Sequence, residues 1–159
     1  IAALHHRHSR YYYGKMKKAT TLHFYSPDTN NEADVWLAGE GISAGFPSPA
    51  DDFKEVRISL DKAVVKNKAA TFYARVAGQS MVGAGLDDGD LLVIDRSLEP
   101  QDGKIAVCFV DGEFTVKRLK VAEDCVWLMP ENEQYKPLQV TEDNALIIWG
   151  IVTHVLKTV

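Results

Sequence analysis

The chain has 159 residues, which is enough for one domain with a hydrophobic core and an additional arm. Apolar residues make up 46% of it and charged residues 25%, and the formal net charge of -4 excludes a general basic field that would recruit nucleic acid. No apolar run approaches the roughly 20 residues of a membrane-spanning helix, and no basic segment followed by an apolar one marks a signal peptide.

Residues 1–15 are predicted to derive from a leader or a vector. They carry His5, His6 and His8 followed by three tyrosines, and Met16 is the expected natural start. Metal binding by the histidine cluster is the less favoured alternative, and we expect neither a metal site nor a cofactor.

Residues 16–52 are predicted to form a mobile, extended arm. They show no sustained hydrophobic period and are rich in Asn, Asp, Gly, Ser and Pro. The one apolar patch of this arm, Val35-Trp36-Leu37-Ala38, is expected to dock on another part of the molecule.

Residues 53–159 are predicted to form a β-rich domain. A short helix is expected over Asp61–Ala70, and the rest consists of short runs rich in Val, Ile, Phe, Tyr and Trp, separated by turn signals. The predicted strands are Thr71–Ala77, Asp90–Asp95, Lys104–Val110, Glu113–Val121, Cys125–Met129 and Ala145–Thr158. This pattern favours a mostly β, barrel-like or folded sheet over a βαβ unit, and no helix-turn-helix is visible.

Asp111-Gly112 lies between two of these strands and is typical of a two-residue type I′ hairpin turn. The turn fixes the register, placing Val110 opposite Glu113 and Ala106 opposite Lys117. Apolar residues occur on both faces of the second strand, so the period alone does not decide which face is buried.

Ser80 and Lys117 are the candidate catalytic pair. A serine hydroxyl needs a base to take its proton, and a lysine serves only if it is neutral near pH 7, well below its ordinary pKa of about 10.4. Burial among apolar side chains lowers the pKa of a lysine. Ser80 follows a predicted strand and Gly78, and backbone amides near it are positioned to bind an oxyanion. Taken separately, a turn serine and a solvated strand lysine are the more common interpretations.

Four further segments occur in a recognisable order together with the Ser80 segment Gly78-Gln79-Ser80-Met81. They are Ala44-Gly45-Phe46-Pro47-Ser48-Pro49-Ala50, Gly85-Leu86-Asp87-Asp88-Gly89-Asp90-Leu91-Leu92-Val93, Val110-Asp111-Gly112-Glu113-Phe114-Thr115-Val116-Lys117 and Gly150-Ile151-Val152-Thr153-His154-Val155. In this order and spacing the chain from Ala44 onward resembles the UmuD and LexA family of self-cleaving proteins.

The resemblance implies a serine peptidase with Ser80 as nucleophile and Lys117 as general base. It places the cut in the arm, between Ala44 and Gly45, and it implies that the amides of Ser80 and Gln79 bind the oxyanion. Gln79 stands where UmuD proteins typically have aspartate. The prolines after Gly45 keep that stretch out of helix, as an extended protease substrate requires.

The resemblance also implies partners: a homodimer that uses the region Ala145–Thr158, a RecA filament on single-stranded DNA that stimulates cleavage, and an error-prone polymerase of UmuC type that takes up the product. No membrane and no sequence-specific DNA binding are expected. The alternatives are a LexA-type or phage-type repressor fragment, a peptidase acting on other chains, and a polymerase accessory module that does not cleave. The short segment before Ala44 favours the UmuD type over a repressor.

The remaining chemically notable residues are interpreted structurally. The two cysteines, Cys108 and Cys125, fit no metal or disulfide pattern and favour a reducing cytoplasm. His154 is predicted to be an interface or core residue, Asp87, Asp88 and Asp90 to be turn residues rather than calcium ligands, and Trp127 and Trp149 to be core or interface aromatics.

Overall fold

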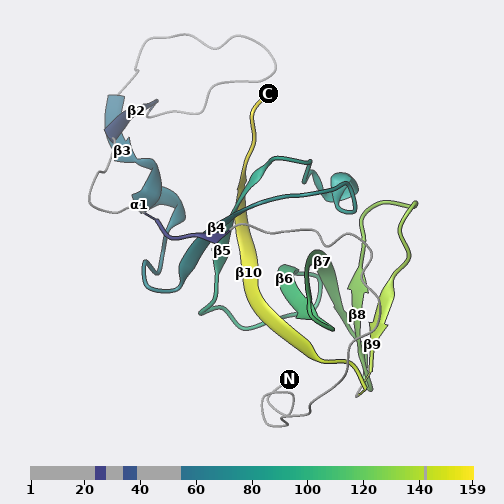
Figure 1. Cartoon of the computed structure of the whole chain (residues 1–159). Helices are drawn as coiled ribbons and strands as arrows, with labels where there is room; N and C mark the ends of the chain where they lie inside the picture. The colour runs from purple at the N-terminus through teal and green to yellow at the C-terminus, as the bar shows by residue number, and fades with distance from the viewer. Residues whose placement is uncertain (1–23, 28–33, 39–54, 142) are drawn as a thin grey trace.

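The computed structural model describes residues 24–27, 34–38, 55–141 and 143–159, so the predictions for residues 1–15 and for the Ala44-Gly45 bond lie outside the described residues. The described chain is mostly β, as predicted, with an eight-stranded sheet, a two-stranded sheet and one short α-helix (Figure 1). None of the helices in these ranges is long and apolar enough to cross a membrane.

The large sheet is antiparallel throughout and has the strand order β1-β4-β5-β10-β6-β7-β8-β9. In chain order its strands are β1 (Phe24–Tyr25), β4 (Thr71–Arg75), β5 (Leu91–Asp95), β6 (Ile105–Val110), β7 (Glu113–Val121), β8 (Val126–Met129), β9 (Leu138–Val140) and β10 (Leu146–Leu156). Six of these correspond to predicted strands, with ends shifted by up to two residues.

The long strand β10 joins the two halves of the sheet. It pairs with β6 over Leu146–Ile151 and with β5 over Ile151–Leu156, and its register shifts twice, after Ile148 and after Val152. Such irregularities bend a strand and increase its twist. Figure 1 shows β10 running between the β4–β5 half and the curled β6–β9 half.

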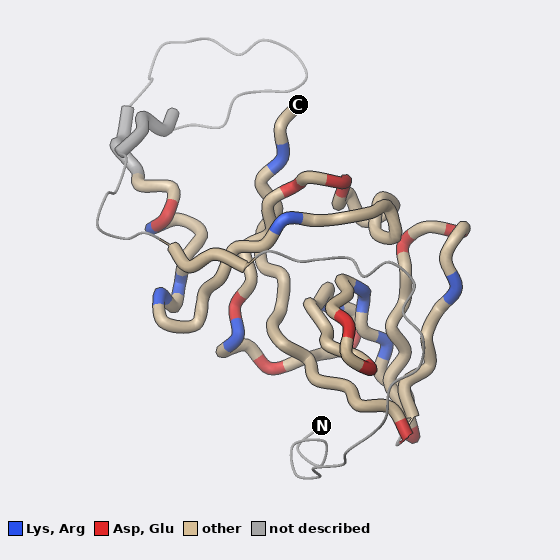
Figure 2. Tube along the Cα trace, viewed as in Figure 1, with Lys and Arg blue, Asp and Glu red and all other residues tan. Residues whose placement is uncertain are grey.

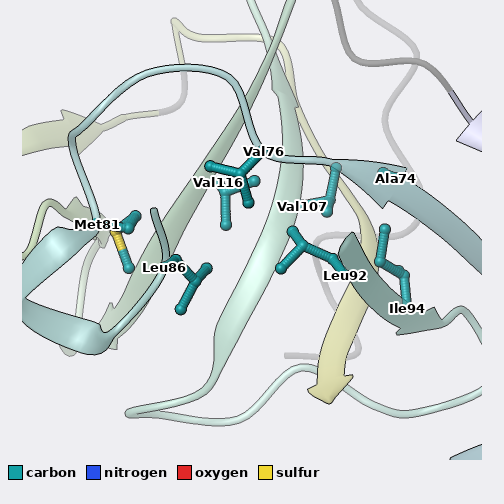
Figure 3. Close-up of a cluster of buried hydrophobic side chains, with 8 residues drawn as sticks. All are labelled: Ala74, Val76, Met81, Leu86, Leu92, Ile94, Val107 and Val116. Atoms are coloured by element: carbon teal, nitrogen blue, oxygen red, sulfur yellow. The ribbon is translucent and has the colours of Figure 1, made fainter. Parts of the chain in front are cut away.

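Because the sheet folds over, both of its faces are covered in the middle. One buried cluster lies between the halves and includes Ala74, Leu92, Val107 and Val116, together with Met81 and Leu86 of the loop after β4 (Figure 3). A second cluster, on the other face of β6 and β7, consists of Ala106, Cys108, Val110, Leu119, Leu128, Val140 and Ile151. Strand β7 therefore contributes buried residues to both clusters.

Two short stretches of the predicted arm form strands. The Asp34–Ala38 segment is strand β2, which pairs antiparallel with β3 (Glu55–Ser59), so the patch expected to dock does pair with another part of the chain. Phe24–Tyr25 forms β1 at the edge of the large sheet.

The predicted helix over residues 61–70 is wrong beyond its first turn. Helix α1 spans Leu60–Val64 and ends at Val65, whose backbone is extended. The Asn67 carbonyl then accepts hydrogen bonds from the Ala70 N–H and the Thr71 hydroxyl, and this turn leads into β4.

Charged residues of both signs are spread over the described chain (Figure 2). The signs also separate locally: Lys62, Lys66, Lys68 and Arg75 follow one another with no acidic residue between them, and Asp87, Asp88 and Asp90 lie together.

Candidate active site

The hairpin that carries Lys117 has the predicted turn and register. Asp111 and Gly112 adopt φ values of 49° and 92°, and a type I′ turn needs positive φ at both central positions. Strand β6 pairs with β7 so that Ala106 lies opposite Lys117. The side chain opposite the lysine is therefore small.

The Lys117 amine donates to three oxygens. Its Nζ lies 2.9 Å from Ser80 Oγ, 2.7 Å from Thr115 Oγ1 and 2.9 Å from the Val116 carbonyl oxygen. Residues 80 and 117, distant in sequence, are thus at hydrogen-bond distance. A nucleophile and its base need this separation for proton transfer.

The surroundings of Lys117 favour its neutral form. Its strand face is shared with the buried residues Ala106, Cys108 and Leu119, which belong to the second cluster. Burial lowers the pKa of Lys117 below its ordinary value, since desolvation penalises the charged amine. Burial also raises the pKa of the Cys108 thiol to about 12, so this thiol stays protonated and adds no negative charge beside the amine.

Ser80 lies in a loop, residues 76–90, whose two ends are held together. The Gly78 N–H donates to Asp88 Oδ1 at 2.7 Å, and the Val76 N–H donates to the Asp90 carbonyl at 2.8 Å. Met81, directly after the serine, is 2% exposed and belongs to the first cluster. The buried methionine anchors the loop while the serine faces Lys117.

A contact that the sequence did not predict holds this loop against the segment after β8. The Glu131 N–H donates to the Ser80 carbonyl at 2.8 Å, and the Glu131 carbonyl accepts from the Gly83 N–H at 2.7 Å. The Asn132 side-chain amide donates to the Gln79 carbonyl at 2.8 Å. The Glu131 carboxylate pairs with Arg118, the residue after Lys117. The Ser80 loop is therefore fixed relative to the strand that carries the lysine.

A pocket of about 250 Å³ opens beside the pair and is lined by residues 76–81, Thr115–Lys117 and Tyr135. The carbonyls of Gln79 and Ser80 are held by Asn132 and Glu131, whereas their N–H groups make no hydrogen bond within the described chain. Two free amides next to a serine have the chemistry that an oxyanion site requires.

The other notable side chains have structural roles. His154 is exposed, which excludes a core position, and its Nδ1 lies 3.1 Å from Thr153 Oγ1. Asp90 accepts from the Asp87 N–H as a turn residue, and the described residues contain no cluster that would hold a metal. Both cysteines are free, and Cys108 is buried.

Comparison with known proteins supports the assignment of this chain to a peptidase family. The Peptidase S24-like family model matches residues 36–153. Protein MucA of Salmonella typhimurium is 44% identical over 117 residues, covering 72% of this chain and 79% of MucA. Protein ImpA of Shigella flexneri is 42% identical over 120 residues, covering 76% and 81%. The LexA repressor of Acidithiobacillus ferrooxidans is 40% identical over 132 residues, covering 81% of this chain and 63% of the repressor.

Proposed function

Because the chain belongs to the S24-like peptidase family, in its LexA and UmuD branch of self-cleaving serine peptidases, we propose that Ser80 and Lys117 cut the chain's own Ala44-Gly45 bond. The observation that carries the assignment is the 2.9 Å contact between Lys117 Nζ and Ser80 Oγ, made by an amine whose pKa is lowered by burial.

The first chemical step is acyl transfer to the serine. Neutral Lys117 takes the proton of the Ser80 hydroxyl as Oγ attacks the carbonyl carbon of Ala44. The negative charge on the former carbonyl oxygen is stabilised by the Ser80 and Gln79 N–H groups. When the intermediate collapses, the bond to the Gly45 nitrogen breaks and protonated Lys117 gives its proton to the leaving amine.

The second step hydrolyses the ester that joins Ala44 to Ser80. Neutral Lys117 takes a proton from a water molecule that attacks the Ala44–Ser80 ester, and the same proton returns to Ser80 Oγ as the ester bond breaks. Thr115 and the Val116 carbonyl accept from the amine throughout, which keeps its lone pair or its proton directed at the serine. The products are a new carboxylate at Ala44 and a chain that starts at Gly45.

The biological setting we propose follows from the resemblance to UmuD. A RecA filament on single-stranded DNA stimulates the cut in the cytoplasm, and the shortened chain serves an error-prone polymerase as a subunit. A homodimer through β10 is supported by its pairing, because beyond Ile151 this strand pairs with β5 and leaves its other edge unpaired within the described residues.

Mass spectrometry after incubation at increasing pH tests the peptidase assignment. The wild type should release a fragment that begins at Gly45, with a rate that rises with pH as Lys117 loses its proton. Ser80→Ala and Lys117→Ala should each lower the rate by about 100-fold or more. Lys120→Ala removes an exposed lysine from the same strand and should cleave like the wild type. Equal cleavage in all four chains would refute the assignment of Ser80 and Lys117 as the catalytic pair.

A repressor function is the second candidate, favoured by the 40% identity to the LexA repressor. The two differ in one measurable property, since a repressor needs sequence-specific binding to duplex DNA. Mobility-shift titration against genomic fragments should give no specific complex for a UmuD-type protein. A specific complex with duplex DNA would instead support the repressor function.

A further inference from the structure

A two-residue strand that precedes the predicted cut covers part of the edge of the large sheet. Strand β1 pairs antiparallel with β4, with Phe24 opposite Ala74 and Tyr25 opposite Tyr73. On its other side β4 pairs with β5. Without β1, strand β4 would expose a row of unpaired backbone groups, which is a template for another strand.

The pleat directs Phe24 inward and Tyr25 outward. Ala74 is fully buried in the first cluster, so the residue opposite it lies on the same inner face. The Phe24 ring lies 4.2 Å from the Trp149 ring and 5.0 Å from the Phe114 ring, measured between centroids. Tyr25 is 52% exposed. Phe24 therefore fills an aromatic site built by β7 and β10.

A second strand before the cut is paired with a segment after it. Strand β2 (Asp34–Ala38) pairs over five positions with β3 (Glu55–Ser59). The Ala44-Gly45 bond lies between these strands in the sequence. Cutting it removes the covalent link and leaves both strand pairings, β1 with β4 and β2 with β3, in place.

We infer that cleavage alone does not free the arm: the cut arm stays bound through β1 and β2, and the β4 edge with its aromatic site is a strand-docking surface first occupied by Phe24–Tyr25. This inference rests on the proposed function. Before the cut the arm competes with other extended segments for the β4 edge, and as a tethered segment it has a high effective concentration, of the order of millimolar. After the cut it leaves on dilution or by exchange with an extended segment that presents an aromatic residue, as Phe24 does.

Native mass spectrometry and gel filtration of the self-cleaved chain test the retention. At micromolar concentration the arm should remain with the Gly45–Val159 product and should leave on dilution. Phe24→Ala removes two ring contacts. It should raise the protein concentration at which half of the cut arm has dissociated by roughly tenfold or more. Tyr25→Ala is the matched control, because its ring is outside the cluster, and should shift that concentration by about twofold at most.

Two results would overturn the inference. An arm that separates from the wild-type product at the earliest time, as fast as from Phe24→Ala, would show that the strands do not retain it. Equal retention in Phe24→Ala and wild type would show that β1 does not contribute. Melting temperatures of the uncut chains establish whether a loss in Phe24→Ala reflects a folding defect of the whole domain.

A failure of self-cleavage is distinguished by the Ser80→Ala chain. A glutamate-specific protease nicks this chain after Glu40, between β2 and β3 in sequence, and mass spectrometry selects the singly nicked product. Residues 1–40 should stay bound, and hydrogen exchange should show β4 amides protected in a way that depends on Phe24. Retention of this fragment together with no self-cleavage of the wild-type chain would contradict the proposed function alone, whereas loss of the fragment would contradict the docking surface.

Discussion

The substitution Gly83→Ala adds one methyl group and tests how the backbone of Glu131 positions the Ser80 loop. A Cβ at Gly83 would lie 2.6 Å from the Glu131 carbonyl oxygen, which is 0.8 Å inside the 3.4 Å at which ordinary contact begins. If the carbonyl retreats by that distance, the 2.7 Å hydrogen bond from the Gly83 N–H stretches to about 3.5 Å, where it contributes little. The bond from the Glu131 N–H to the Ser80 carbonyl is made by the same residue, through the preceding peptide group, and is disturbed with it.

We therefore expect Gly83→Ala to weaken two hydrogen bonds, each with a net contribution of about 1 kcal/mol. The free energy of unfolding should fall by roughly 2 kcal/mol. Because Ser80 lies in the displaced loop, a misplacement of the nucleophile approaching 1 Å should lower the cleavage rate by about 100-fold. The rate should thus fall by much more than the folded fraction does.

Urea denaturation and a time course of fragment release measure the two effects. Val82→Ala is the control, since it changes the neighbouring residue, 38% exposed, without adding an atom near Glu131. Its unfolding equilibrium constant and its cleavage rate should both stay within about twofold of the wild-type values. A Gly83→Ala chain that cleaves at the wild-type rate would refute the idea that the backbone of Glu131 positions the serine.

Other consequences of the partly buried Lys117 and of the second cluster can be measured separately. Lys117→Met should raise the melting temperature near pH 7: burial lowers the pKa of Lys117 in the folded chain, so the unfolded chain binds more protons and wild-type stability rises with pH up to the ordinary lysine pKa. The advantage of the variant should shrink as pH rises toward 10.5, and a pH-independent difference would contradict this origin. A thiol reagent at pH 8 should label Cys125 and leave Cys108, with its pKa of about 12, unlabelled until the chain unfolds; rapid native labelling of Cys108 would show that the cluster opens. Leu128→Ala should cost about 2–5 kcal/mol of unfolding free energy in denaturant titration, and a loss under 1 kcal/mol would show that the second cluster repacks.

The features that the sequence predicts are those with a local cause. Asp111-Gly112 sets the turn of its own hairpin, and therefore the pairing of Ala106 with Lys117 follows from the sequence alone. The strands of the large sheet that have four or more residues also carry enough β-branched and aromatic residues to be recognised, whereas the five-residue strands β2 and β3 are not predicted. Strand β9 escapes recognition because it has three residues and only Val140 is buried, which is too short for a period.

The features that the sequence does not predict depend on distant partners. Phe24 forms a strand because β4, far along the chain, offers it an edge, and nothing near Phe24 indicates this. Glu131 and Asn132 hold the Ser80 loop largely through backbone groups, which any residue can supply, so the sequence of this segment indicates only a turn. The sequence also leaves the orientation of Lys117 open, because the folded sheet buries residues on both faces of β7.

The geometry of the pair constrains how cleavage is controlled. Ser80 and Lys117 lie at hydrogen-bond distance with the arm strands β1 and β2 paired to the sheet and to β3. The loop of the serine is fixed through Glu131, and the amine is held by Thr115. Under the proposed mechanism, an activator therefore has no catalytic pair left to assemble, and its contribution is to favour the state in which the Ala44-Gly45 bond occupies the pocket.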